Sequence, residues 1–273
     1  MQGLENLTGV AGLILAIPFG LCLGSFATAI ASRIPLGKSW IFSKDKGAER
    51  SACVHCHHGL GVLDLIPLFS WLFLRGRCRY CQVRIGVRYP LTECAALLMT
   101  LMAYYSWGFS GQGLLVILAI PFLLAMLMID WEHMILPDQL QIIVLVLGGL
   151  FWGAGVGEYF SLSDLLGQIM VMALYAGPIF LMGWMISRLK KVEALGFGDV
   201  KFMAIAGLWL GISALPLFFV LTGVMGIVFS IFWKFRTGVQ RFPFGPALIT
   251  SFFIVLCLQG PLLKMFFNAS LGL

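Results

Sequence analysis

Charged side chains are scarce in this chain, and their scarcity excludes most classes of protein. Asp, Glu, Lys and Arg make up 11% of the 273 residues, and hydrophobic types make up 60%. A soluble domain carries about 25% charged and about 45–50% apolar residues, so this chain is neither an ordinary soluble domain nor a disordered one. With only 7 cysteines it is not a small disulfide-stabilised secreted domain either. A polytopic membrane protein remains.

Long apolar runs account for most of the sequence. A helix that crosses a bilayer needs about 20 mostly apolar residues. About eight runs reach or approach this length: residues 9–31, 91–107, 114–129, 140–156, 165–186, the short run 200–210 and, after a tight turn near Gly211, 212–233 and 244–267. The first run is too long for a signal peptide and lacks preceding basic residues, so we expect it to be retained. The sequence predicts an all-α polytopic membrane protein with about eight transmembrane helices.

Basic residues collect between these runs. The formal net charge is +6, and the largest basic group lies within residues 33–90, with smaller groups at 188–191 and 234–241. Basic loops stay on the cytoplasmic side of a membrane. We therefore expect an N-terminus on the side opposite the cytoplasm, a first transmembrane helix in residues 1–32, a cytoplasmic domain in 33–90 and a membrane core in 91–273. No nucleic-acid partner is expected, because no soluble module interleaves basic with aromatic residues.

Four cysteines form two CxxC pairs in the predicted cytoplasmic domain. The pairs are Cys53 with Cys56 and Cys78 with Cys81. Two such pairs, a few tens of residues apart, can close a tetrahedral thiolate site. Two disulfides or free thiols are the alternative, but a cytoplasmic loop is kept reduced. We predict a structural zinc ion, since four protein ligands leave no position open for water. The other cysteines stand alone in apolar runs and are expected to be small buried residues: Cys22, Cys94 and Cys257.

Three aspartates lie at the predicted cytoplasmic ends of apolar runs. Asp138 follows Pro137 and precedes a run, which is typical of a helix N-cap, and Asp199 also precedes a run. Asp130 instead ends a run, where the helix dipole disfavours an anion. An ionisable residue at such a position indicates a functional site.

Asp130 and Asp199 are suited to act as a pair. Two aspartates in a sheltered site can share one proton, so that one activates a water molecule and the other protonates a scissile carbonyl. Gly196 and Gly198 precede Asp199 and carry no side chain, so backbone or peptide can approach it closely.

The order of these motifs resembles that of the bacterial type IV prepilin peptidases, which are GxGD-type membrane aspartyl proteases. The resemblance covers nearly the whole chain. Its motifs are Gly24-Ser25-Phe26, Arg33-Ile34-Pro35, the two CxxC pairs, Ile66-Pro67-Leu68-Phe69-Ser70-Trp71-Leu72, Gly76-Arg77-Cys78, Arg88-Tyr89-Pro90-Leu91 with Glu93, Ile129-Asp130, Leu136-Pro137-Asp138, Gly196-Phe197-Gly198-Asp199-Val200-Lys201 and Pro243-Phe244-Gly245-Pro246.

The resemblance implies a location, a substrate and two activities. The protein would lie in the bacterial inner membrane, in contact with lipid, and serve a type IV pilus or type II secretion system. Asp130 and Asp199 would cleave a prepilin or pseudopilin after the glycine of its leader, at the cytoplasmic face. The new N-terminus would be methylated with S-adenosylmethionine. Two further sets of residues are implied: Gly196, Gly198, Lys201 and Asp138 in support of the protease site, and Gly76 and Arg77 in the methyl-transfer region.

Two other classes of protein account for part of the pattern. In a secondary transporter, Asp130 and Asp199 would bind protons or ions, but such sites lie near the bilayer midplane, between repeated halves. A zinc-dependent redox or sensor protein with an inert membrane anchor would give Asp199 no role. The peptidase is the interpretation that uses both the aspartates and the cysteines.

Overall fold

The computed structural model describes residues 2–37, 51–156, 161–190, 196–239 and 242–271. Parts of the predicted loops, at 38–50, 157–160 and 191–195, lie outside this set. Within it the regular structure is helical apart from two isolated β-bridges. The all-α prediction is therefore confirmed.

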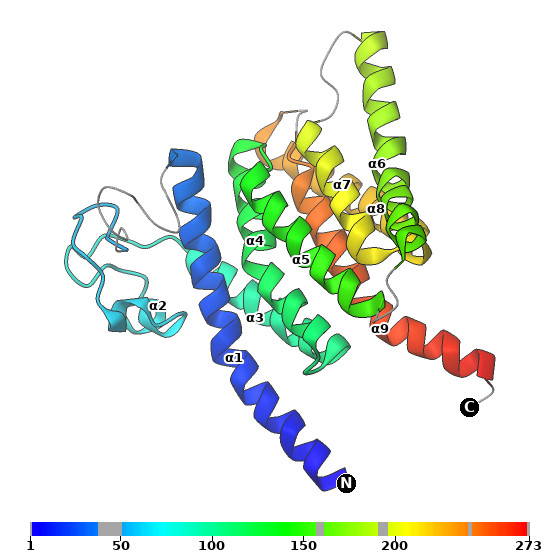
Figure 1. Cartoon of the computed structure of the whole chain (residues 1–273). Helices are drawn as coiled ribbons and strands as arrows, with labels where there is room; N and C mark the ends of the chain where they lie inside the picture. The colour runs from blue at the N-terminus through cyan, green and yellow to red at the C-terminus, as the bar shows by residue number, and fades with distance from the viewer. Residues whose placement is uncertain (1, 38–50, 157–160, 191–195, 240–241, 272–273) are drawn as a thin grey trace. The chain divides into compact units, whose positions relative to one another are not determined.

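Each predicted apolar run forms a helix. The eight helices are α1 (Gln2–Arg33), α3 (Arg88–Trp107), α4 (Gly111–His133), α5 (Asp138–Val156), α6 (Leu162–Lys190), α7 (Phe197–Leu210), α8 (Leu215–Thr237) and α9 (Gly245–Leu271), as Figure 1 shows. The predicted tight turn is present at Gly211, where φ is +69°.

Fewer helices qualify as membrane spans than the sequence predicted. Among the described residues, 5 helices are long and apolar enough to cross a membrane: α1, α4, α5, α6 and α8. Helix α7 has 14 residues and is therefore about 21 Å long, which is shorter than a hydrocarbon core of about 30 Å. Helix α3 is long enough, but it carries Arg88 and Glu93 in its first turns.

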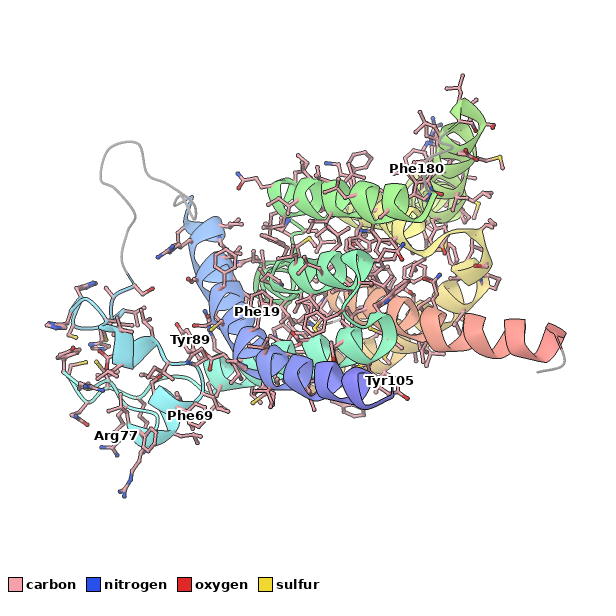
Figure 2. The ribbon with its side chains drawn as sticks, turned by 60° about the horizontal axis from the view of Figure 1, so that its bottom comes forward. Phe19, Phe69, Arg77, Tyr89, Tyr105 and Phe180 are labelled. Carbon is pink, nitrogen blue, oxygen red and sulfur yellow. The ribbon has the colours of Figure 1, made fainter. Side chains whose placement is uncertain are left out.

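Apolar side chains cover the outer surfaces of these helices. Phe19 and Phe180, which are labelled in Figure 2, are each nearly half exposed. Cys22 and Cys94 are also exposed, so the expectation that both are buried was wrong, whereas Cys257 is buried. A helix surrounded by lipid can expose small apolar residues at no cost, because its solvent is itself apolar.

The chain forms two compact units, and the first comprises residues 1–105 and 120–125. Here α1 and α3 approach closely through small residues. A Cβ on Gly24 would lie 2.5 Å from the Cα of Glu93, and one on Gly20 would lie 2.9 Å from the hydroxyl of Thr100. Between these helices the described part of the chain forms three short helices, η1 (Ile34–Leu36), η2 (Val62–Leu65) and α2 (Phe69–Phe73), and the segments that hold the four paired cysteines.

The second unit comprises residues 106–119 and 126–273, and α7 lies at its centre. Helix α7 packs against α5, α6 and α9, and α8 packs against α9 (Figure 1). Trp209 of α7 donates a hydrogen bond of 3.0 Å to the carbonyl oxygen of Val144 on α5. Gly148 makes room for this indole ring, since a Cβ there would lie 2.4 Å from its nitrogen.

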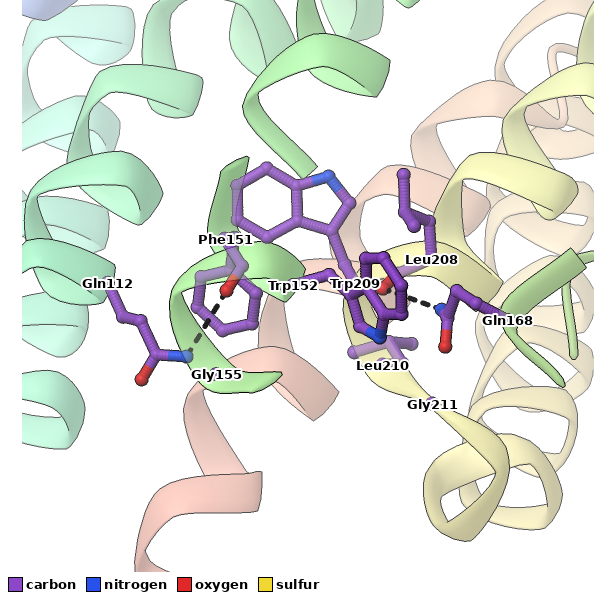
Figure 3. A pocket seen from close by; sticks show the side chains of 9 residues that line it. All are labelled: Gln112, Phe151, Trp152, Gly155, Gln168, Leu208, Trp209, Leu210 and Gly211. Carbon is purple, nitrogen blue, oxygen red and sulfur yellow. Dashed lines mark hydrogen bonds between the residues drawn. The ribbon is translucent and has the colours of Figure 1, made fainter. Parts of the chain in front are cut away.

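Side chains from neighbouring helices satisfy the carbonyl groups at the C-terminal end of α7. Gln168 donates hydrogen bonds to Gly207 and Leu208, Tyr175 donates one of 2.8 Å to Gly211, and Gln259 donates one to Leu210. A pocket of about 290 Å³ lies at this end, lined by Gln112 and Gln168 among others (Figure 3). The described residues that line it include no titratable side chain, and neither Asp130 nor Asp199 is among them.

Candidate functional site

Asp130 lies in the last turn of α4 and is almost completely buried, with 4% of its surface exposed. Its Oδ2 accepts a hydrogen bond of 2.8 Å from the backbone N–H of Gly245, the first residue of α9. The positive end of the α9 dipole therefore meets the carboxyl group. This contact explains how an acidic residue is kept at the unfavourable end of α4.

Gly245 is a site residue to which the sequence analysis gave no role. A Cβ at this position would lie 2.6 Å from Oδ2 of Asp130, so any larger residue would displace the carboxyl group. The available signal was the sequence Pro243-Phe244-Gly245-Pro246, in which glycine precedes a proline at a helix start. The sequence did not reveal which side chain this glycine accommodates.

Asp199 lies in the first turn of α7. The helix follows Gly196, and the N–H of Asp199 donates a hydrogen bond of 3.1 Å to the Gly196 carbonyl oxygen. A Cβ on Gly196 would lie 3.3 Å from Oδ2 of Asp199, so this glycine leaves room for the carboxyl group. The two predicted aspartates lie far apart in sequence, yet they are near enough to interact electrostatically.

Helix α5 packs beside this first turn of α7. Lys201 forms an ion pair of 2.8 Å with Asp138, in which both side chains are partly exposed. Asp138 is the first residue of α5, and its side chain binds Lys201, whereas the sequence predicted that it caps α5. Gly198 allows close packing here, since a Cβ on it would lie 3.1 Å from the Cβ of Leu136.

Gln141 is a second residue to which the sequence analysis gave no role. It lies one turn after Asp138, is 2% exposed, and its amide nitrogen is 3.6 Å from where a Cβ of Gly198 would lie. That nitrogen donates a hydrogen bond of 3.2 Å to the Leu136 carbonyl oxygen, which fixes the orientation of the amide. Its Oε1 is buried and has no hydrogen-bond partner among the described residues. A buried carbonyl oxygen next to the first turn of α7 can therefore accept one more hydrogen bond.

The four paired cysteines come together in the first unit. Their sulfur atoms all lie within 4.8 Å of one another, and those of Cys53 and Cys81 are 3.8 Å apart. Sulfur atoms placed about 2.3 Å from a central zinc ion in a tetrahedron would be about 3.8 Å apart, so the cluster fits such a site. None of the seven cysteines, all of which are described, forms a disulfide.

The two halves of this cluster repeat the same backbone structure. In the first half, His57 N–H donates to the Cys53 carbonyl oxygen at 2.9 Å, and in the second Gln82 N–H donates to that of Cys78 at 3.0 Å. His57 and Gln82 both have positive φ, at 56° and 58°. The backbone N–H groups of Cys56 and His55 lower the pKa of the Cys53 thiol to about 6. The backbone N–H of Val83 acts to lower the pKa of Cys81, but burial and hydrogen bonds with the neighbouring thiols outweigh it and raise that pKa to about 11, so Cys53 ionises more readily than Cys81.

Asp64 and Tyr80 connect the two halves. The ring centroids of Tyr80 and His58 are 3.7 Å apart. The Tyr80 hydroxyl donates a hydrogen bond of 3.2 Å to the carboxyl group of Asp64. Asp64 also pairs with Arg79 at 2.9 Å. Burial, followed by the charge on Asp64, raises the pKa of Tyr80, so its hydroxyl stays protonated as a donor.

The two residues predicted for methyl transfer lie beside the second half of the cluster. Gly76 has a φ of +67°, and a Cβ on it would lie 2.8 Å from the ring of Trp71. The turn and this contact both require glycine. Arg77 is exposed and forms a β-bridge with Arg84.

Comparison with known proteins identifies both parts of the chain. The family model described as "Bacterial Peptidase A24 N-terminal domain" matches residues 18–107, and the one described as "Type IV leader peptidase family" matches residues 117–231. No solved structure matches the chain significantly.

Curated relatives match over most of their length. The prepilin leader peptidase/N-methyltransferase of Aeromonas hydrophila is 33% identical over 269 residues, which cover 89% of each chain. The enzyme of the same name from Pectobacterium carotovorum is 35% identical, with coverage of 79% of this chain and 81% of its own. A type 4 prepilin-like proteins leader peptide-processing enzyme of Escherichia coli is 32% identical, with 86% and 90% coverage. This chain therefore belongs to the type IV leader peptidase family.

Proposed function

We propose that this protein removes the leader peptide from prepilins or pseudopilins and then methylates the new N-terminus. The observation that carries the proposal is the approach of Asp130 and Asp199 at the ends of two helices, with Asp130 bound by the N-terminus of α9. The names of the curated relatives, which combine both activities, supply the substrate class.

In the proposed cleavage step, Asp130 is the general base and Asp199 the general acid. The N–H of Gly245 favours a carboxylate at Asp130. Asp130 takes a proton from water, the water oxygen attacks the scissile carbonyl carbon, and Asp199 protonates the carbonyl oxygen. When the intermediate collapses, the C–N bond breaks and the leaving nitrogen receives the proton held by Asp130, while Asp199 recovers its own.

Five residues would support this step. Gly196 leaves room for the carboxyl group of Asp199, and Gly198 allows the first turn of α7 to pack closely against Leu136, just before α5. The ion pair between Lys201 and Asp138 would hold the starts of α7 and α5 in register. The free Oε1 of Gln141 would accept a hydrogen bond from the water molecule or from an N–H of the unwound substrate.

The membrane orientation follows from the basic loops. We propose a periplasmic N-terminus in the bacterial inner membrane, with the cysteine cluster and the aspartates at the cytoplasmic side. Cleavage would then occur at the membrane surface, after the glycine of a leader that remains cytoplasmic.

The four cysteines would hold a structural zinc ion. The mutual approach of their sulfur atoms, all within 4.8 Å of one another, supports this ion, which would fix the two halves of the loop to each other. S-adenosylmethionine would supply the methyl group, and Gly76 and Arg77 belong to the region that we assign to methyl transfer.

A reconstituted cleavage reaction tests the proposal. The purified protein is mixed with a prepilin and S-adenosylmethionine, and mass spectrometry reports leader loss and methyl addition separately. Asp130→Asn and Asp199→Asn should each lower the cleavage rate by about 100- to 10,000-fold, which is the range expected when a general acid or base is lost.

Asp164→Asn is the matched control. This aspartate lies in the same unit, but it is exposed and binds Ser161 at the start of α6. Its replacement should leave cleavage unchanged. Wild-type-like cleavage by Asp130→Asn would remove that residue from the mechanism.

A further inference from the structure

An apolar surface segment lies between the two halves of the cysteine cluster. This segment, residues 62–73, contains η2 and α2 and exposes seven large apolar side chains. Val62 and Phe73 are each 84% exposed, and Leu63, Phe69 and Leu72 are more than half exposed. So dense an apolar surface on a soluble loop indicates a partner.

Charge is nearly absent from this segment. Asp64 is its only charged residue, and the Asp64 side chain is 6% exposed because it binds Arg79. The exposed residues of the segment are therefore all apolar.

The position of this segment along the membrane helices suggests what covers it. The N–H of Leu68 donates a hydrogen bond of 2.6 Å to the carboxyl group of Glu93 in α3, which in turn lies against Gly24 of α1. Leu68 has a φ of +62°, a conformation that a leucine rarely adopts, so this attachment fixes the backbone.

The attachment point lies inside the ends of both helices. Glu93 follows Arg88, the first residue of α3, by five residues, which corresponds to about 7 Å along the helix axis. Gly24 precedes Arg33, the last residue of α1, by nine residues, or about 13 Å. Arginines at helix ends lie at the membrane surface. The centre of the segment is thus attached below that surface, at the depth of the lipid headgroups and the first acyl carbons.

Arginines follow the segment directly. Arg75 and Arg77 are exposed, and Arg77 extends outward from the loop in Figure 2. Exposed apolar side chains next to arginines are the pattern of a segment that lies in an anionic membrane surface.

We propose that residues 62–73 insert into the boundary between headgroups and acyl chains of the leaflet that the loop faces. The apolar side chains contact acyl chains, and Arg75 and Arg77 contact anionic phospholipid headgroups. The loop that carries the cysteine cluster is thereby held against the membrane. This inference does not depend on the activity proposed above.

Photo-crosslinking of the full-length protein in lipid nanodiscs tests the insertion. A benzophenone amino acid replaces Val62 or Phe73, and mass spectrometry counts adducts with phosphatidylethanolamine and phosphatidylglycerol. Val54 is the matched control, because it is 82% exposed and lies in the first half of the cysteine cluster, outside the segment. Each labelled protein must first elute from a sizing column as the wild type does.

Lipid adducts should be several-fold more abundant at positions 62 and 73 than at position 54. The double substitution Arg75→Gln and Arg77→Gln should reduce phosphatidylglycerol adducts at position 73 without a matching loss of phosphatidylethanolamine adducts. Equal lipid yields at positions 54, 62 and 73 would overturn the proposal. Adducts at 62 and 73 that join this protein to itself, or to added prepilin in place of lipid, would also overturn it and identify the partner.

Discussion

The cysteine cluster and the aspartate site are built in opposite ways. Each half of the cluster is one short stretch of chain, and both halves fold with the same hydrogen bonds. The aspartate site draws on α4, α5, α7 and α9, and the hydrogen bond that holds Asp130 joins residues 115 positions apart in the sequence. The first site depends on local backbone geometry, and the second depends on how four helices pack.

Because of this difference, substitutions at the two sites should have different consequences. A lost cysteine changes a loop whose ligands are organised locally, whereas one added methyl group in a helix contact can displace a carboxyl group. Variants at each site should therefore affect different measurements, and the first of the following predictions tests directly whether the two sites are independent.

The largest effect is expected for Gly245→Ala. The new methyl group would lie 2.6 Å from Oδ2 of Asp130 and push the carboxyl group away. Cleavage should fall about 100-fold or more, as for a displaced general base. Gly223→Ala on α8 is the matched control, because a Cβ there has no atom within 4 Å. If metal content fell together with cleavage, the sites would not be independent.

A smaller but clear effect, on the amount of bound zinc, is expected for Cys78→Ser. Cys78 is the buried member of the four cysteines, and its loss should lower bound zinc at least about tenfold, since a tetrahedral site then lacks one ligand. Limited proteolysis should also cut the loop faster, because a small loop needs its metal to stay folded. Cys94→Ser, which alters an exposed cysteine of α3, should retain zinc. Equal zinc content in the Cys78→Ser and Cys94→Ser variants would contradict the assignment of Cys78 as a zinc ligand.

Gln141→Met should lower the rate constant for cleavage about tenfold. Methionine keeps the length of the side chain but cannot accept the proposed hydrogen bond, which is worth about 1–2 kcal/mol. The kcat should fall more than KM rises, and Gln141→Glu, which keeps an acceptor oxygen, should recover part of the rate. A loss of thermal stability with unchanged kcat would limit Gln141 to a structural role.

The smallest effect is expected at the ion pair between Lys201 and Asp138. The two side chains are 40% and 63% exposed, so the pair is worth about 0.2–1 kcal/mol. Lys201→Met and Asp138→Asn should each reduce cleavage less than about fivefold, and the double variant should resemble either single one. A much larger loss for Lys201→Met alone would mean that this lysine contacts the substrate.

The same contrast explains which parts of the structure could be predicted. Spacing alone predicted the four thiols, because the CxxC pattern fixes its own backbone. Hydrophobic runs predicted the helices, and unusual placement singled out Asp130. Gly245 and Gln141 were missed because their roles depend on contacts between helices distant in sequence. The number of membrane spans stays a prediction, because apolar character does not show that α7 ends where neighbouring side chains bind its carbonyl groups.

The shortness of α7 has a consequence for how the protein is inserted into the membrane during synthesis. With 14 residues it cannot be released into lipid alone, because its last carbonyl groups would lack partners in the hydrocarbon. Gln168 and Tyr175 on α6 are synthesised before α7 and supply some of those partners, whereas Gln259 on α9 arrives afterwards. The helix that carries Asp199 therefore depends on α6 and α9 for the partners of its last carbonyl groups. Helix α9 has a second task, because its first residue, Gly245, binds Asp130.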